Sequence, residues 1–276
     1  MIAAGPMKRF CVVSIFAVAA AAPLAAAQEK PAMSAEELAK AVQNPVANLI
    51  SVPFQNNTNF NVGPRDGTQN ILNIQPVIPI SLSPDWNLIT RTILPIIWQP
   101  GFTPGQSSTT GLGDLQFSAF LSPNTATGLI WGAGAIAQAP TNSNDRLGND
   151  RWGLGPTAVV LRIEKGSPWV YGALANNVWS VGGGNDPKYN NFLLQPFLNY
   201  NLPVGLYLTS APIITANWEA SGSQRWTVPL GGGVGKIFHF GRLPVNMQLS
   251  AYYNVVAPDI GPDWQVRFQV QFMFPK

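Results

Sequence analysis

The amino-acid sequence predicts an all-β fold: a transmembrane antiparallel up-and-down β-barrel of about 12 strands, preceded by a short N-terminal helical leader. Three observations predict this class. An export segment opens the chain, runs of β-forming residues fill the rest, and only 11% of the 276 residues are charged. Because ordinary soluble domains carry roughly 25% charged residues, the composition indicates a surface that water does not fully cover.

Residues 1–27 are organised like a signal peptide. Lys8 and Arg9 give a positive start, an apolar run follows, and the alanines at 25–27 provide a cleavage site, so the mature chain is expected to begin at Gln28. An uncleaved anchor is the alternative. The one cysteine, Cys11, falls in this segment, and the mature chain is therefore expected to lack disulfide and thiol chemistry.

The mature chain is expected to be nearly neutral. Loss of Lys8 and Arg9 takes Lys plus Arg from 16 to 14, against 13 Asp plus Glu. This balance removes the electrostatic support for nucleic-acid binding, and no nucleic-acid partner is expected. Beyond residue 27 no apolar stretch has the length of a membrane helix. Entry into a bilayer would therefore require a closed barrel.

Residues 28–48 are expected to form a periplasmic leader. Ser34 and Glu37 have the spacing of a capping box, which predicts the start of a short helix. The pair Asn44-Pro45 ends that helix.

Residues 49–276 are expected to form the barrel. Runs rich in β-branched and aromatic residues alternate there with clusters of Gly, Pro, Asn and Asp. The candidate strands, an even number as bacterial barrels require, are 49–62, 70–83, 86–99, 112–122, 128–139, 152–164, 169–181, 191–202, 206–218, 225–238, 243–255 and 263–274.

The predicted connections alternate in length along the chain. The short ones are 83–86, 123–126, 165–168, 203–205 and 239–242, and the longer polar ones are 63–69, 100–111, 140–151, 182–190, 219–224 and 256–262. Bacterial barrels combine short periplasmic turns with longer external loops. Both termini are therefore expected on the periplasmic side.

Several strands alternate between apolar and polar residues, which gives one face for lipid and one for water. A soluble β-sandwich alternates too, but here the polar side carries mainly Asn, Gln, Ser and Thr instead of Lys and Glu, which favours an enclosed lumen. The candidate lumen-facing residues are Asn73, Gln75, Asp114, Gln116, Arg162, Gln195, Asn199, Thr215, Asn217, Asn246, Gln248, Asn254, Arg267, Gln269 and Gln271.

All nine tryptophans lie near predicted strand ends, where a strand crosses the headgroup level of a membrane. The alternative is that they are ordinary core residues. The candidate girdle residues are Trp86, Trp98, Trp131, Trp152, Trp169, Trp179, Trp218, Trp226 and Trp264.

Prolines inside the candidate strands argue against an unbroken barrel, because each removes a ladder donor. They are expected at bulges, breaks or rims. The residues are Pro53, Pro76, Pro79, Pro95, Pro196, Pro212 and Pro229.

Seven segments of the mature chain have a pattern typical of a known family: NPVANLISVPFQNNTNFNVGPRDGTQNILNIQPVIP, GLGDLQFSAFLSP, DRWGLGPTAVV, FLLQPFLNYNLP, PIITANWEA, RWTVPLGGGVGKIF and AYYNVVAPD. Through them nearly all of the mature chain resembles the bacterial outer-membrane proteins grouped with the phenol-degradation meta-pathway channels, some of whose members carry the misleading name neuromedin U. The resemblance implies a barrel with a transport role and brings no catalytic residues. One departure concerns the C-terminus: barrel-assembly machinery usually reads a terminal aromatic residue, and here Pro275 and Lys276 follow Phe274.

No enzymatic, metal or cofactor site is expected. The one histidine, His239, falls in a predicted short turn with no serine and orienting group beside it. The triple glycine from Gly231 lacks the Lys-Ser/Thr of a phosphate loop and is expected to serve close strand packing. The loop oxygens of Asn142, Asn144, Asp145, Asn149 and Asp150 could hold calcium, but their spacing matches no known calcium loop, and a solvated loop with turn-forming residues is the preferred interpretation.

Three functions are compatible with this sequence. The first is an outer-membrane channel or transporter-like barrel for small uncharged or hydrophobic solutes, with weak ion selectivity because the lumen candidates are mostly neutral. The second is a non-conducting structural or surface-interaction barrel. The third is a soluble periplasmic β-protein. The expected partners of the first are outer-membrane lipid, the barrel-assembly machinery and a small solute that the residues do not identify.

Overall fold

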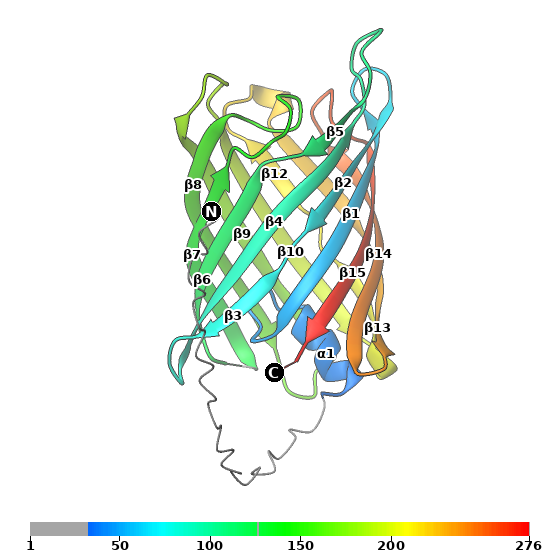
Figure 1. Cartoon of the computed structure of the whole chain (residues 1–276). Helices are drawn as coiled ribbons and strands as arrows, with labels where there is room; N and C mark the ends of the chain where they lie inside the picture. Colours follow the sequence, from blue (N-terminus) through cyan, green and yellow to red (C-terminus); the bar gives the residue numbers. More distant parts are fainter. Residues whose placement is uncertain (1–32, 126, 276) are drawn as a thin grey trace, which may run out of the picture. The chain divides into compact units, whose positions relative to one another are not determined.

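The computed structural model describes residues 33–125 and 127–275. The predicted signal peptide, residues 1–27, and the first part of the leader lie outside the described residues. The described chain is a closed antiparallel barrel with one short helix at its N-terminal end (Figure 1).

The barrel has twelve strands, which confirms the predicted class and number. Strand β1 (Ile50–Val62) pairs with β15 (Trp264–Phe274) and thereby closes the sheet. The other unbroken strands are β4 (Trp86–Gln99), β7 (Gly128–Ala139), β8 (Arg151–Ile163), β9 (Trp169–Gly183), β10 (Asn190–Asn201), β13 (Trp226–Phe240) and β14 (Leu243–Val256).

Three barrel strands are each broken into two segments, which the sequence pattern did not separate. These are β2 (Gly67–Ile74) with β3 (Val77–Ser81), β5 (Thr109–Leu112) with β6 (Leu115–Pro123), and β11 (Leu206–Ser210) with β12 (Ile214–Asn217). Both segments of each pair bond to the same neighbouring strand, so each pair acts as one strand of the barrel.

The breaks explain the prolines that argued against a barrel. Pro76 and Pro212 lie in breaks, while Pro53, Pro95 and Pro196 lie beside the break of the adjacent strand. The carbonyl oxygen of Pro53 accepts from the Gln75 N–H at 2.8 Å, and that of Pro95 from the Gly113 N–H at 2.9 Å. At each of these prolines the missing N–H donor therefore faces a backbone segment that is not part of the regular ladder of strand hydrogen bonds.

The remaining two prolines and His239 lie within continuous strands. Pro229 adjoins a register shift between β13 and β14, as expected for a bulge. Pro79 lies in the middle of the short strand β3 and pairs with Ile89 of β4. His239 requires a correction: it lies within β13 opposite Pro244, not in the turn, because β13 extends to Phe240.

The leader helix α1 (Ala35–Val42) begins with the predicted capping box. The Glu37 N–H donates to Ser34 Oγ at 3.2 Å, and the Ser34 N–H donates to Glu37 Oε2 at 2.8 Å. One face of the helix buries Leu38 and Ala39. No helix among the described residues is long and apolar enough to cross a membrane. Two short 3₁₀ turns, η1 (Pro203–Gly205) and η2 (Gly222–Gln224), complete the elements.

Tryptophans form two levels on the outer surface, with large apolar side chains exposed between them. Six lie toward the end that carries the long loops, at the top of Figure 1: Trp98, Trp152, Trp179, Trp218, Trp226 and Trp264. Three lie toward the end that carries α1: Trp86, Trp131 and Trp169. This arrangement is what two membrane interfaces require, and the girdle role remains a prediction.

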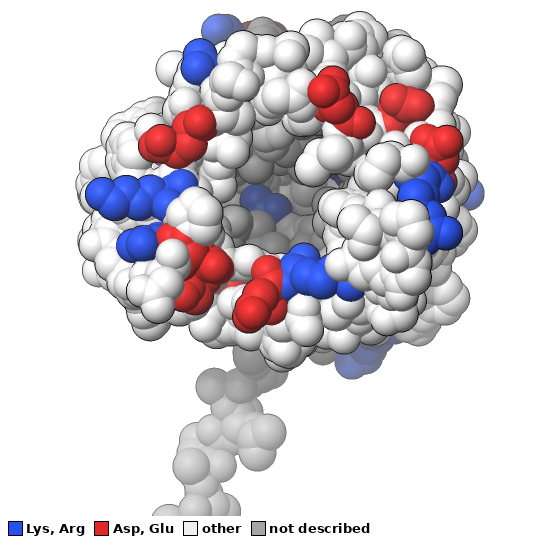
Figure 2. Space-filling view, turned by 90° about the horizontal axis from the view of Figure 1, so that it is seen from above, with Lys and Arg blue, Asp and Glu red and all other residues white. Residues whose placement is uncertain are grey.

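The barrel is hollow. Seen from the loop end, Figure 2 shows a central opening ringed by acidic and basic side chains, with basic side chains also in its depth. The residues that line and close this interior are therefore the candidates for a functional site.

Candidate functional site

The inner face of the barrel can be assigned from the alternation of burial along each strand. In β8 every second residue is buried, from Thr157 through Val159 and Leu161 to Ile163, while the residues between them are exposed. Directly paired residues of neighbouring strands share a face, so this assignment extends around the whole barrel.

Fourteen of the fifteen lumen candidates have side chains on the inner face by this alternation and pairing, from Asn73 opposite the buried Gln55 to Gln271 opposite Pro53. Asp114 and Asn217 lie at the margins, in the β5–β6 break and at the exposed end of β12. Their part in solute passage stays a prediction.

Arg162 is the exception, and its assignment to the lumen was wrong. Its side chain is 51% exposed and bonds Glu164 at 2.7 Å beside the turn after β8. Both faces of β8 are apolar, so an inward position would place the charge against Leu161 and Ile163. A long cationic side chain near a strand end reaches water more easily from the outer surface.

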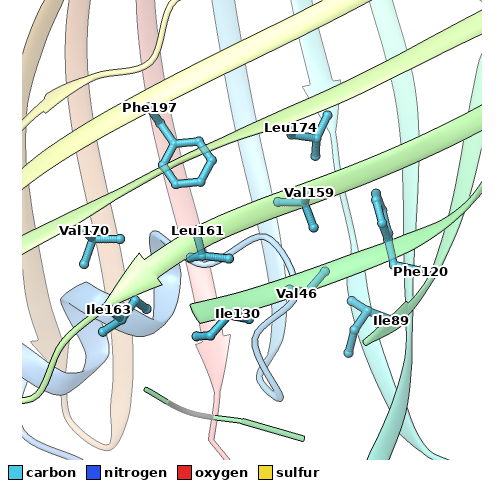
Figure 3. Close-up of a cluster of buried hydrophobic side chains, with 10 residues drawn as sticks. All are labelled: Val46, Ile89, Phe120, Ile130, Val159, Leu161, Ile163, Val170, Leu174 and Phe197. Atoms are coloured by element: carbon cyan, nitrogen blue, oxygen red, sulfur yellow. The ribbon is translucent and has the colours of Figure 1, made fainter. Parts of the chain in front are cut away.

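One side of the interior is an apolar wall that the sequence analysis missed. Ten side chains from β4, β6, β7, β8, β9, β10 and the leader pack together there (Figure 3): Val46, Ile89, Phe120, Ile130, Val159, Leu161, Ile163, Val170, Leu174 and Phe197. A polar lumen face was expected from the sequence, but β8 is apolar on both faces, and on β6 and β10 the inner polar residues Gln116, Gln195 and Asn199 lie beside apolar ones. The near-continuous apolar run of β8 was the available signal.

The opposite side of the interior is polar. On β1, β14 and β15 the inner face carries hydrogen-bonded amides and hydroxyls: Gln271 Nε2 donates to Ser51 Oγ at 3.1 Å, and Tyr207 Oη donates to Asn246 Oδ1 at 2.8 Å. The cross-section of the interior is therefore amphipathic, with apolar and polar halves facing each other.

Two arginines project into this interior. Arg267, only 2% exposed, donates to Asn57 Oδ1 at 3.1 Å, to the Ala211 carbonyl at 2.9 Å and to Gln265 Oε1 at 3.0 Å. Arg91 on β4 donates to Gln75 Oε1. Arg267 was predicted from the sequence to face the lumen, whereas Arg91 was not, because β4 has no continuous polar face around it.

A cavity of about 160 Å³ lies where the polar wall meets the leader. The barrel strands supply both arginines, Phe197 and several amides, including Gln75, Asn246 and Gln271. The leader supplies the remaining wall through Ala41, Val42, Gln43, Asn44, Pro45 and Ala47. The leader therefore occupies the interior at the α1 end of the barrel.

Polar contacts hold the leader at this end. Lys40 Nζ donates to the Ser167 carbonyl at 2.7 Å. The amides of Gln43 and Asn201 bond each other reciprocally at 2.9 and 3.1 Å. Apolar packing adds to these bonds, since Leu38 and Ala39 form one buried cluster with Leu49, Tyr207, Ile237 and Met273.

Acid should weaken one of these contacts. Glu36 Oε1 accepts from the Val204 N–H at 2.8 Å, and hydrogen bonds from its own backbone and from Val204 lower the pKa of Glu36. Its contribution to leader docking is present above the ordinary glutamate pKa of about 4.3 and is lost as pH falls through the lowered value. We expect the leader to leave the barrel more often below about pH 4, measured as the rate at which pepsin cleaves the leader relative to an unfolded control peptide. In Glu36→Gln this relative rate should no longer change across the same range, and an identical pH response in both forms would contradict the assignment.

Gly235 creates the space in which Tyr207 packs. A Cβ at Gly235 would lie 2.1 Å from Cζ of Tyr207, whose ring is 1% exposed and held through its hydroxyl. Gly235→Ala is therefore expected to destabilise the barrel by about 1–3 kcal/mol through overpacking, measured by urea titration of heat-modifiable gel mobility. Gly182→Ala is the matched control, because nothing lies within 4 Å of its added Cβ. Equal stability of the two variants would contradict this.

At the loop end, the connection 140–150 packs onto the inner side of the β5–β6 break. Leu147 is 5% exposed, and the Leu112 N–H donates to Ser143 Oγ at 2.9 Å. Asp114 anchors the loop by accepting the N–H groups of Asn142 at 3.3 Å and Asn149 at 2.8 Å. This loop narrows the interior from above.

Three of the five loop residues considered for calcium, Asn144, Asn149 and Asp150, accept backbone N–H groups through their side-chain oxygens. The carboxylate of Asp150 accepts the N–H groups of Asn185 and Asp186 at 2.6 and 2.9 Å, and Asn149 Oδ1 accepts from the Arg151 N–H. Across residues 33–125 and 127–275, no group of three or more His, Cys, Asp or Glu side chains could hold a metal ion.

Comparison with known proteins places the fold. The chain matches no protein-family model and no curated protein. Among solved structures it is similar to an outer membrane channel from Pseudomonas putida F1, with a TM-score of 0.62 and 20% identity over 83% of this chain and 96% of that one. It also aligns with outer membrane phospholipase A from Escherichia coli, with a TM-score of 0.44 and 13% identity over 89% and 99% of the two chains. The first similarity supports the barrel fold.

Proposed function

We propose that this protein is an outer-membrane channel for small solutes whose bodies are at least partly apolar. The single observation that carries the proposal is the hollow, amphipathic interior, with an apolar wall opposite a polar one. A purely structural barrel of this size gains nothing from an accessible cavity of about 160 Å³ that is lined by two arginines, one of them buried. The similar barrel from Pseudomonas putida F1 is itself described as an outer membrane channel.

The outer surface supports the membrane location. Tryptophans form two levels around a band of exposed apolar side chains, including Leu129, Leu154, Leu208, Leu230 and Leu249. Such a band matches lipid tails between two headgroup regions. We assign both termini and the leader to the periplasmic side, because the short turns lie at that end of the barrel.

The test is conductance of the purified, refolded full-length mature chain in a planar lipid bilayer. Discrete current steps are expected. Their amplitude should be small, because the leader and the loop 140–150 narrow the interior. Folding is verified separately by heat-modifiable gel mobility. Folded protein that gives no steps, either intact or without the leader, would instead support the non-conducting barrel.

A further inference from the structure

The cavity between the leader and the polar wall has an unbalanced charge. Among its lining residues the charged ones are Arg91 and Arg267, both positive. In the described part of the chain the ion pair present joins Arg162 to Glu164 on the outer surface, so neither cavity arginine is paired with a carboxylate. Charges in a confined interior are usually paired, and this cavity therefore attracts an anion.

Arg91 has donors to spare. A guanidinium carries five N–H donors, and one bond links Arg91 to Gln75 Oε1. Arg91 is partly exposed and lines the cavity, so its remaining donors are accessible from the interior. Planar guanidinium groups bind carboxylates through two parallel hydrogen bonds.

Arg267 is held more firmly and supplies mainly a fixed positive field. Its three hydrogen bonds and its position 4.8 Å from the centre of the Tyr252 ring fix the guanidinium. It links β15 to Asn57 of β1 and to the Ala211 carbonyl in the β11–β12 break. Arg91 is therefore the residue suited to direct contact with a bound anion.

The rest of the cavity fits an apolar body. Val77 and Phe197 line it from the barrel, and Val42, Ala47 and Leu49 line it from the leader side. Its volume of about 160 Å³ is similar to that of a roughly 150 Å³ cavity that accepts benzene. A carboxylate on a ring or short chain would place its charge on Arg91 and its body against these side chains.

We propose that the cavity is a binding site for small organic monocarboxylates with an aromatic or short aliphatic body. This deepens the proposed channel function by naming the solute class, and it differs from the uncharged solutes expected from the sequence. Because binding requires no conduction, it is tested without an open pore, so its failure is distinguishable from failure of the channel proposal.

The experiment is fluorine NMR of para-fluorobenzoate with the folded, full-length mature chain in non-ionic detergent. Wild type should broaden the signal, and unlabelled benzoate should reverse the broadening. The neutral isostere para-fluorobenzamide should bind at least about tenfold more weakly, because it lacks the charge-assisted bonds. Equal binding of the two probes, or displacement of the probe by chloride as effective as by benzoate, would overturn the proposal.

Variants test the assigned residue. Arg91→Gln should weaken para-fluorobenzoate binding by roughly tenfold, and Arg91→Lys should restore part of the affinity. Arg162→Gln is the matched control, because it removes one arginine from the outer surface and should leave binding unchanged. Unchanged binding in Arg91→Gln, or equal losses in both glutamine variants, would overturn the proposal. The comparison of the two probes on wild type decides the question even if Arg91→Gln does not fold.

Discussion

Removal of the leader, residues 28–48, is expected to raise the single-channel conductance severalfold. The leader provides six of the residues that line the cavity and closes the interior at the α1 end. Its removal leaves an interior bounded by the strands and the loop 140–150 alone. Barrels of about 12 strands lie between those filled by side chains and the wide porins, so the freed pore should conduct ions readily.

A point substitution should reproduce this effect without shortening the chain. Leu38 is 2% exposed in the cluster that holds α1, and Leu38→Asp should cost about 3 kcal/mol or more of leader docking. The variant should conduct like the truncated protein. Glu37→Gln, on the exposed side of the helix, keeps a residue suited to the capping box and should behave like wild type. Unchanged conductance in both the truncation and Leu38→Asp would show that the leader does not close the pore.

Strand positions could be predicted from the sequence, because turn residues and β-forming runs are local signals. The predicted range 86–99 coincides with β4, and 128–139 with β7. The breaks within three of the strands could not be predicted from the sequence. A break such as Gln75-Pro76 depends on contacts with the neighbouring strand, here the hydrogen bond from the Gln75 N–H to the Pro53 carbonyl. The prolines indicated that some strands would be irregular, and the register between neighbouring strands shows where the breaks lie.

Only part of the interior lining could be predicted from the sequence. The assumption that polar residues face the lumen holds for the polar wall of β1, β14 and β15, but not for the apolar wall opposite. Gln269 and Gln271 lie on the inner face, opposite Gln55 and Pro53, whereas Arg162 lies on the outer face of a strand that is apolar on both sides. Arg91 was not predicted, because β4 has no continuous polar face around it. Docking of the leader could not be predicted from the sequence. The helix itself is indicated by Ser34 and Glu37, but the leader's partners Ser167, Asn201 and Val204 lie far along the chain, and local patterns do not identify them.

The pore freed of its leader is expected to prefer anions, in place of the weak selectivity that the sequence suggested. Arg91 and Arg267 face the interior without a carboxylate partner, whereas the nearest acidic lumen candidate, Asp114, is held by the loop 140–150. Their field reaches across a narrow lumen at low salt, where the Debye length is about 10 Å at 0.1 M. The reversal potential under a KCl gradient should have the sign for chloride preference, and the preference should shrink toward 1 M salt, where the Debye length is about 3 Å.

The substitution Gln75→Glu tests whether the charge of the cavity, and not the width of the pore, determines the anion preference. The substitution places a carboxylate of nearly the same size beside Arg91, its present hydrogen-bond partner, and halves the net positive charge of the cavity. The shift in reversal potential should therefore move toward zero while conductance and heat-modifiable mobility stay close to those of the parent. Arg162→Gln, which removes an outer-surface charge, should leave the reversal potential unchanged. If Gln75→Glu had no effect while Arg162→Gln abolished anion preference, the selectivity would arise at the rim of the barrel, and the two interior arginines would have no part in it.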